Sequence, residues 1–221
     1  MARRSPSAGI PARANSRLSR AGIVAAAVEL ADREGLAGFS MRKLAQALEV
    51  DAMSIYYHVH DKGTLLACMA DAVTAEIVAA PSAGPWTARL RALIMAAREV
   101  MLRHPWAVRV IEGGDTPTPA VLMHIERVLA IMRAGDCPVD LGHHAIHLLG
   151  SRILGFSQDL FADKPGAAPP PPGAFDALPH VGELAAEASH SGTLGGCDDD
   201  VEFAFALDLI LDGLERRRTS Q

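Results

Sequence analysis

The chain of 221 residues is long enough for one large domain or two modest ones, and 49% hydrophobic residues allow a sizeable buried core. Only 5% of the residues are aromatic while Ala, Leu and Val are abundant, which favours an all-α fold. The three cysteines are far apart and form no CxxC pair, which argues against a disulfide framework and a zinc knuckle. No run of eighteen apolar residues occurs, so the sequence predicts a cytoplasmic protein that does not cross a membrane.

The charges are divided unevenly along the chain, whose formal net charge is −5. Residues 1–62 carry nine Lys/Arg against six Asp/Glu, which is +3, whereas residues 63–221 carry twelve against twenty, which is −8. This asymmetry predicts a small basic module with a polyanionic partner, carried on a larger acidic module.

The first seventeen residues contain four arginines and no apolar run, and they predict a flexible basic arm. This arm is either a solvated tail or an addition to the contacts with DNA. A first helix is then expected, with Ser19 as its N-cap, Ile23 and Leu30 on its buried stripe and Gly35 at its end.

A second and a third helix follow closely. Ser40 is the expected N-cap of the second, which ends near Leu48, and Phe39 and Leu44 have the spacing of a hydrophobic staple. Asp51 is the expected N-cap of the third, over residues 52–59. Two helices joined by a three-residue turn predict a helix-turn-helix, in which the second helix lies in the major groove of DNA.

The segment MRKLAQAL, a turn and then IYYHVHDKGTLL resemble the DNA-binding domain of TetR (tetracycline repressor) family regulators, with a match from about Ser19 to Ile77. The resemblance implies a three-helix DNA-binding domain over residues 18–63 that contacts double-stranded DNA. It implies contacts to phosphates and bases from Arg42, Lys43, Ala52, Met53, Ser54, Tyr56, Tyr57, His58 and Lys62.

Two positions depart from the family pattern. Glu49 stands where the family usually has a turn glycine, so a strained or altered turn is expected there. Ala52 and Met53 are apolar where some relatives read bases with an amide, and contact with thymine methyl groups is the expected use for them.

A fourth helix is predicted to run from Lys62 to about residue 80, with Asp61 as its N-cap. A larger helical domain for ligand binding and dimerisation is expected over residues 81–221. Its predicted helices are Trp86 to about Arg103, Pro105–Glu112, Pro119–Ala134, Pro138 to about Ala162, and Val201–Arg217, with a mobile proline-rich loop at 164–174.

The last predicted helix is apolar on two faces, and a second subunit is the simplest cover for the second face. The resemblance implies that residues 139–162 and 201–217 pair with their twofold mates as a four-helix bundle, so that a homodimer binds a palindromic operator. The predicted interface residues are Leu148, Phe156, Phe203, Leu207, Ile210, Leu211 and Leu214.

A ligand cavity is expected among the middle helices, lined by Trp86, Met101, His104, Trp106, Met123 and Phe156, although each of these residues by itself is more often plain core. The resemblance places His104 where tetracycline-binding members have a metal-ligating histidine, and Asp159 near an acidic residue lent by the partner. Val78 and Leu93 replace a histidine and an asparagine that hold tetracycline. We therefore expect a different effector, largely apolar or aromatic, and no resident cofactor or metal.

Two alternatives remain from the sequence. His143 and His147 have the i, i+4 spacing of two metal ligands, and a helical metal-dependent enzyme could use them, but no third ligand and no nucleophile motif accompany them. The principal expectation is therefore a ligand-responsive transcriptional repressor rather than an enzyme. An activator of the same fold is the alternative regulator.

Overall fold

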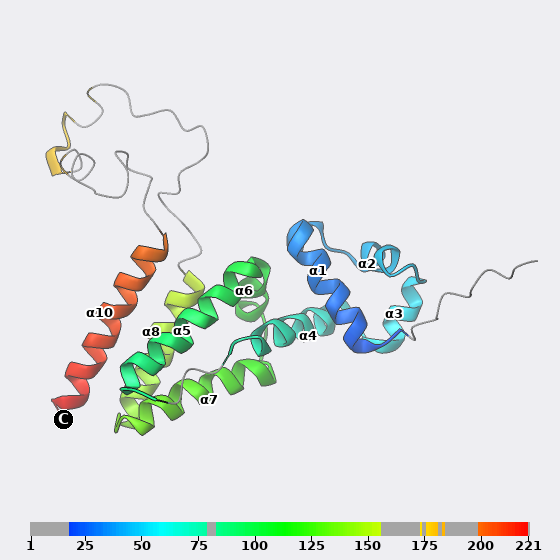
Figure 1. The fold of residues 1–221 in the computed structure, drawn as a ribbon. Coiled ribbons are helices and arrows are strands. Elements are labelled where there is room, and N and C mark those ends of the chain that lie inside the picture. The colour runs from blue at the N-terminus through cyan, green and yellow to red at the C-terminus, as the bar shows by residue number, and fades with distance from the viewer. Residues whose placement is uncertain are drawn as a thin grey trace, which may run out of the picture. The chain divides into compact units, whose positions relative to one another are not determined.

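The computed structural model describes residues 18–78, 83–155, 173, 176–180, 183 and 199–220, and these contain helices and no strand (Figure 1). The all-α prediction is confirmed. The helices are α1 (Arg20–Gly38), α2 (Met41–Ala47), α3 (Ala52–His58), α4 (Lys62–Ala75), α5 (Trp86–Arg103), α6 (Pro105–Glu112), α7 (Pro119–Ala134), α8 (Val139–Gly155) and α10 (Asp199–Thr219). The chain divides into two compact units between Leu65 and Leu66, in the first turn of α4.

Helix α1 begins as its sequence predicts, but it continues past the predicted end at Gly35 to Gly38. The Ser19 hydroxyl accepts a hydrogen bond from the Gly22 amide at 3.1 Å, and Ile23 and Leu30 are buried. Gly35 has a φ of 66°, which interrupts the regular helix at the predicted residue. Glycine suits this position because it has no Cβ to collide with the preceding turn.

The helix-turn-helix is also confirmed, together with both of its caps. The Ser40 hydroxyl accepts from the Lys43 amide at 3.3 Å, and an Asp51 carboxylate oxygen accepts from the Met53 amide at 2.8 Å. Phe39 is buried before α2, in the position expected for a hydrophobic staple.

Glu49 adopts the left-handed backbone that the missing glycine implied, with a φ of 55°. The Val50 amide donates to the Ala45 carbonyl at 3.0 Å and the Glu49 amide donates to the Gln46 carbonyl at 3.2 Å. These two bonds form a Schellman motif, which satisfies the last carbonyls of α2. A non-glycine residue in this conformation lowers the stability of the fold by roughly 1 kcal/mol relative to glycine.

In the C-terminal unit, α5, α6 and α7 have the predicted bounds. Helix α4 is shorter than expected, since it ends at Ala75 rather than near residue 80. Its last turn tightens, because the Glu76 and Ile77 amides donate to Val73 and Thr74, three residues back. Sequence periodicity continues through this segment, so it could not reveal the tightening.

Helix α5 forms the centre of this unit and packs against α6, α7, α8 and α10. Its apolar stripe is buried, and it consists of Trp86, Leu90, Leu93, Ile94, Ala97, Val100 and Met101. Helix α10, which follows 43 residues after α8, returns along α5 and α8 (Figure 1). The Arg98 guanidinium of α5 lies 4.7 Å from the centre of the Phe203 ring and pairs with Asp200 at 2.5 Å.

The two apolar faces of α10 are real, but the predicted interface residues lie on the face that packs within the chain. Phe203, Leu207, Leu211 and Leu214 are buried in their own unit and Ile210 is half-buried. The second face exposes Val201, Phe205 and Leu209. Periodicity identifies two stripes but not which one meets α5. Leu148 of α8 is exposed, and Phe156 lies outside the described residues.

The buried indole of Trp86 links α5 to α10. Its Nε1 donates to a Glu215 carboxylate oxygen at 2.8 Å, and Glu215 also accepts from Arg218. The bond from Arg218, and then that from Trp86, lower the pKa of Glu215 to about 2. Gly135 lies against the indole so closely that a Cβ there would be 2.3 Å from the ring.

No helix in the described part of the chain is long and apolar enough to span a membrane.

We predict that Gly135→Ala lowers the stability of the C-terminal unit by about 1–3 kcal/mol, because the added methyl overlaps the Trp86 ring and the packed core must shift. Chemical denaturation followed by tryptophan fluorescence measures the change. Gly114→Ala is the matched control, since a Cβ there meets its nearest neighbour at an ordinary 3.4 Å. Equal stability of the two variants would contradict the close approach at Gly135.

Candidate nucleic-acid interface and ligand cavity

Helix α3 presents most of its side chains to solvent. Tyr57 is 90% exposed and Met53 is 73% exposed, whereas Ile55 is fully buried, and α3 packs against α2. Ser54 and Tyr56 are also exposed, and Ala52 and His58 are half-exposed. All six residues predicted from α3 are therefore accessible to a partner that docks on this helix.

An open groove runs along this surface. It is lined by Leu18, Val50, Met53, Ser54, Tyr57 and His58. Leu18 and Val50 are not among the residues predicted from the sequence for this surface. The signal for Val50 was available, because the residue after a left-handed C′ position turns the chain toward the next helix.

The three basic residues predicted at this surface have different surroundings. Arg42 is exposed at the start of α2. Lys43 Nζ forms an ion pair with a Glu34 carboxylate oxygen at 2.5 Å, with both side chains largely in solvent. Lys62 Nζ donates to the Phe39 carbonyl at 3.4 Å and lies 5.5 Å from the centre of the Phe39 ring. Lys62 therefore ties the start of α4 to the loop before α2.

The start of α4 is capped by its own neighbour. The Thr64 amide donates to an Asp61 carboxylate oxygen at 2.6 Å, as the sequence predicted for an N-cap. This bond is the main reason that the pKa of Asp61 lies below its usual value. An ionised Asp61 already complements the positive end of the helix, so α4 offers its lysine rather than free amides to an anion.

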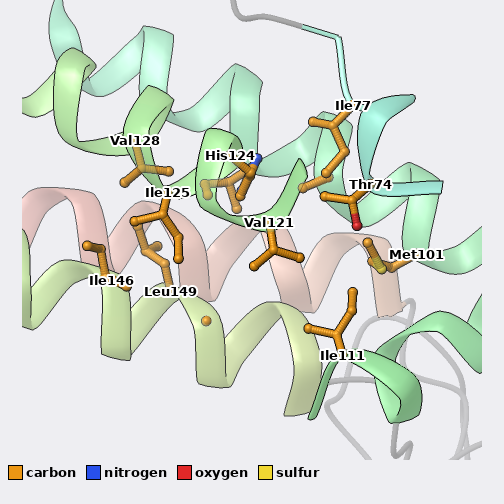
Figure 2. Close-up of a pocket in the computed structure, with 13 residues that line it drawn as sticks. Thr74, Ile77, Met101, Ile111, Val121, His124, Ile125, Val128, Ile146 and Leu149 are labelled. Atoms are coloured by element: carbon orange, nitrogen blue, oxygen red, sulfur yellow. The ribbon is translucent and has the colours of Figure 1, made fainter. Parts of the chain in front are cut away.

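A cavity of about 180 Å³ lies within the C-terminal unit, between α4, α5, α7 and α8 and beside the end of α6 (Figure 2). Its walls are almost entirely aliphatic. The lining residues are Thr74, Ile77, Ile94, Ala97, Met101, Ile111, Val121, His124, Ile125, Val128, Ile146, Leu149 and Gly150.

This lining differs from the predicted one, with which it shares Met101. Trp86 and Trp106 are buried elsewhere, the first against Gly135 and the second beside His104. Met123 lies on the outer face of α7 and is 52% exposed. The predicted lining consists of large side chains, because large residues suit an apolar cavity. In the structure, the cavity lies instead where medium-sized aliphatic side chains do not fill the space between helices. Phe156 lies outside the described residues.

His104 does not line the cavity either. It is buried at the end of α5, where its Nε2 lies 3.6 Å from Glu76 and its ring meets Trp106 edge-on at 6.3 Å between centres. Val78 is exposed and Leu93 is fully buried, and neither lines the cavity. Asp159 lies outside the described residues.

Thr74 and His124 are the cavity-lining residues with polar side chains (Figure 2). The Thr74 hydroxyl donates to the Ala70 carbonyl at 2.8 Å. His124 Nδ1 is fully buried and has no hydrogen-bond partner. Burial, and then the nearby Arg127 charge, lower the pKa of His124, so the imidazole is neutral near pH 7.

Helices α4 and α7 cap one another beside this cavity. An Asp71 carboxylate oxygen of α4 accepts from the Ala120 amide at the start of α7, at 2.7 Å. In return Arg127 of α7 donates to the Ile77 carbonyl just after α4, at 3.1 Å. Each charge also has the sign that favours the helix end it meets. The two helices are therefore joined on both sides of Thr74 and His124.

The histidines of α8 lie on its outer surface. The rings of His143 and His147 are 4.7 Å apart between centres, and both side chains are exposed. Within the described parts of the chain, no three His, Cys, Asp or Glu side chains converge on a common metal position. The predicted pairing of the two rings is thus present, and no third ligand joins it among those residues.

Comparisons with known proteins agree with this arrangement of a helix-turn-helix and a helical cavity. Residues 23–68 match the model for bacterial regulatory proteins of the tetR family, and residues 79–218 match the model for the tetracyclin repressor-like C-terminal domain.

Similar proteins include curated regulators and a solved structure. The transcriptional repressor DrrR1 of Streptomyces coeruleorubidus is 32% identical over 207 residues, which are 87% of this chain and 76% of that protein. A transcriptional regulator of Saccharopolyspora erythraea is 40% identical over 113 residues, 51% of this chain and 48% of that protein. ActR of Streptomyces coelicolor in complex with actinorhodin is 26% identical, with a TM-score of 0.72 and coverage of 92% and 99%.

Two adjacent family models that together span most of the chain, and a repressor aligned over 87% of it, carry the assignment. The chain belongs to the TetR family of bacterial transcriptional regulators.

Proposed function

We propose that this protein is a repressor that binds a palindromic operator as a homodimer and leaves it when a small, largely apolar ligand fills the cavity between α4, α5, α7 and α8. The observation that carries the proposal is the presence, in one chain, of an exposed recognition helix and an aliphatic cavity. The relative DrrR1 is named a repressor, and ActR binds actinorhodin. Since its partner is genomic DNA, we place the protein in the cytoplasm.

The proposed operator contacts divide into two kinds. Met53, Ser54 and Tyr57 lie on the exposed surface of α3 and are suited to base edges and thymine methyl groups in the major groove. Arg42, Lys43 and Lys62 are suited to phosphates, which position the helix without reading sequence. The proposed operator-contacting surface also includes Ala52, Tyr56 and His58.

The proposed dimer uses the outer faces of α8 and α10. Phe205, Leu209 and Val201 expose a continuous i, i+4, i+8 stripe on α10. Leu148 on α8 is exposed as well. Burying such side chains against a twofold mate removes apolar surface from water, which stabilises the pair.

The proposed release passes through α4. This helix carries Lys62 at its first residue and Thr74, a cavity residue, near its last. The mutual caps with α7 hold the cavity end of α4 in place, so a ligand that separates the walls strains those caps. The ligand must bind the DNA-incompetent arrangement more tightly, because equal affinity for both arrangements shifts neither.

Replacement of Glu34 tests the proposed role of Lys43. Glu34→Gln removes the ion-pair partner, so the affinity for operator DNA should rise a few-fold at low salt, in keeping with an exposed pair worth about 0.2–1 kcal/mol. Lys43→Ala in the same background should abolish the gain and flatten the slope of log K against log salt by about one. Glu29→Gln, also on an exposed part of α1, is the charge-matched control. A gain that survives Lys43→Ala would remove Lys43 from the contacts.

Phe205→Asp tests the proposed dimer. Because Phe205 is 61% exposed within its own chain, the variant should fold but become monomeric and lose cooperative operator binding. Light scattering during size-exclusion chromatography and gel shift measure the two effects. Leu122→Asp changes a similarly exposed residue on α7 and should remain dimeric. A dimeric Phe205→Asp protein would move the interface away from this face.

Gly150→Leu tests whether the cavity controls release. Gly150 lines the cavity and a Cβ there meets no atom within 4 Å, so a leucine side chain at this position begins in open space. The variant should bind operator as the parent does but resist release by a panel of one- to three-ring aromatic compounds, with at least a tenfold higher half-effective concentration. Fluorescence anisotropy of labelled operator measures both. Unchanged release would place the effector elsewhere.

A further inference from the structure

The polar contents of the cavity restrict the chemistry of its ligand. The Thr74 hydroxyl is already engaged with the Ala70 carbonyl within its own helix. His124 Nδ1 has no partner, and leaving a buried polar atom unpaired costs about 1–3 kcal/mol. Among the described lining residues, His124 is therefore the side chain that carries an unpaired polar atom, and in this structure that atom is covered rather than facing the cavity.

The size of the cavity restricts the ligand further. An apolar cavity of roughly 150 Å³ can hold benzene. The present cavity of about 180 Å³ therefore accepts a small aromatic ring with one or two substituents, or one ring of a larger ligand that extends toward the cavity's open side. A ligand without any polar group would leave Nδ1 unpaired, and a strongly polar ligand would lose its hydration to aliphatic walls.

We propose that His124 is a specificity-determining residue, and that the effector is an aromatic or fused-ring molecule whose hydroxyl group forms a hydrogen bond with the His124 imidazole. This inference rests on the proposed function of the cavity and names the ligand class that it selects. A hydroxyl suits a neutral imidazole, because it can donate to an unprotonated Nδ1 or accept from a protonated one.

The binding geometry requires one movement of the imidazole. His124 Nδ1 is fully buried, so the ring must turn about its χ2 torsion to meet a hydroxyl in the cavity. This torsion is broad, so the turn costs little. Burial and the charge of Arg127 both disfavour the imidazolium form, so the ring meets the hydroxyl as a neutral partner. Arg127 itself is held by the Ile77 carbonyl. The same segment of α7 thus carries both His124, which binds the hydroxyl, and Arg127, which caps α4.

The test uses p-cresol and p-xylene, which have the same shape and differ by a hydroxyl in place of a methyl group. Calorimetric titration of the full-length protein gives both dissociation constants, and their ratio isolates the contribution of the hydroxyl. His124→Leu should shift that ratio at least tenfold in favour of p-xylene. His124→Asn, which keeps an amide near the Nδ1 position, should restore most of the preference for p-cresol.

Histidine NMR gives a readout that a merely structural role would not change. In protein with ¹⁵N-labelled histidine, p-cresol should shift the His124 Nδ1 resonance and p-xylene should not. Met101→Leu alters the aliphatic wall only and should leave the ratio of dissociation constants unchanged. Operator binding without ligand confirms that each variant is folded.

The two proposals fail in different ways. If both probes bind and the ratio is the same in wild type and His124→Leu, His124 does not select the ligand, although the cavity still binds one. If neither probe binds wild type at millimolar concentration, the cavity is not a ligand site and both proposals fall.

Discussion

The mutual capping of α4 and α7 is the contact on which the rest of this regulator's working arrangement depends. Asp71 closes the start of α7 and Arg127 closes the end of α4. Without these bonds, the Ile77 carbonyl after α4 and the Ala120 amide at the start of α7 would lose these partners beside an aliphatic cavity, which is costly. The caps therefore fix where α4 ends, and that end forms one wall of the cavity.

In the proposed release, α4 is the helix that would connect the cavity with the operator-binding unit. Helix α4 has its first residue in the N-terminal unit and most of its length in the C-terminal unit. Lys62 ties its start to the loop before α2, and the caps tie its end to α7. A ligand need only favour one position of α4 over another to change operator affinity.

In the proposed ligand site, the nearly apolar cavity and the unpaired His124 Nδ1 divide the task of recognition. Aliphatic walls would supply most of the binding free energy without selecting orientation, because apolar burial is non-directional. A hydrogen bond to His124 would add that direction, since a buried polar group discriminates strongly between ligands that satisfy it and ligands that do not. Its place on α7, three residues before Arg127, puts this discrimination next to the cap of α4.

The sequence by itself determined the local structure. Side-chain caps at Ser19, Ser40 and Asp51, and the prolines before α6 and α7, act over a few residues and so can be read without knowing the fold. The same locality allowed Glu49 to be predicted in an unusual turn.

Only the tertiary structure decided which apolar residues face a neighbour, a cavity or solvent. Phe203 and Phe205 lie on opposite faces of one helix and both fit its periodicity, but contact with α5 buries the first and exposes the second. His104 and His124 are both histidines among apolar residues, yet only His124 lines the cavity. Which of these side chains is buried, exposed or lines the cavity depends on how helices far apart in sequence pack together. A local sequence pattern does not determine that packing.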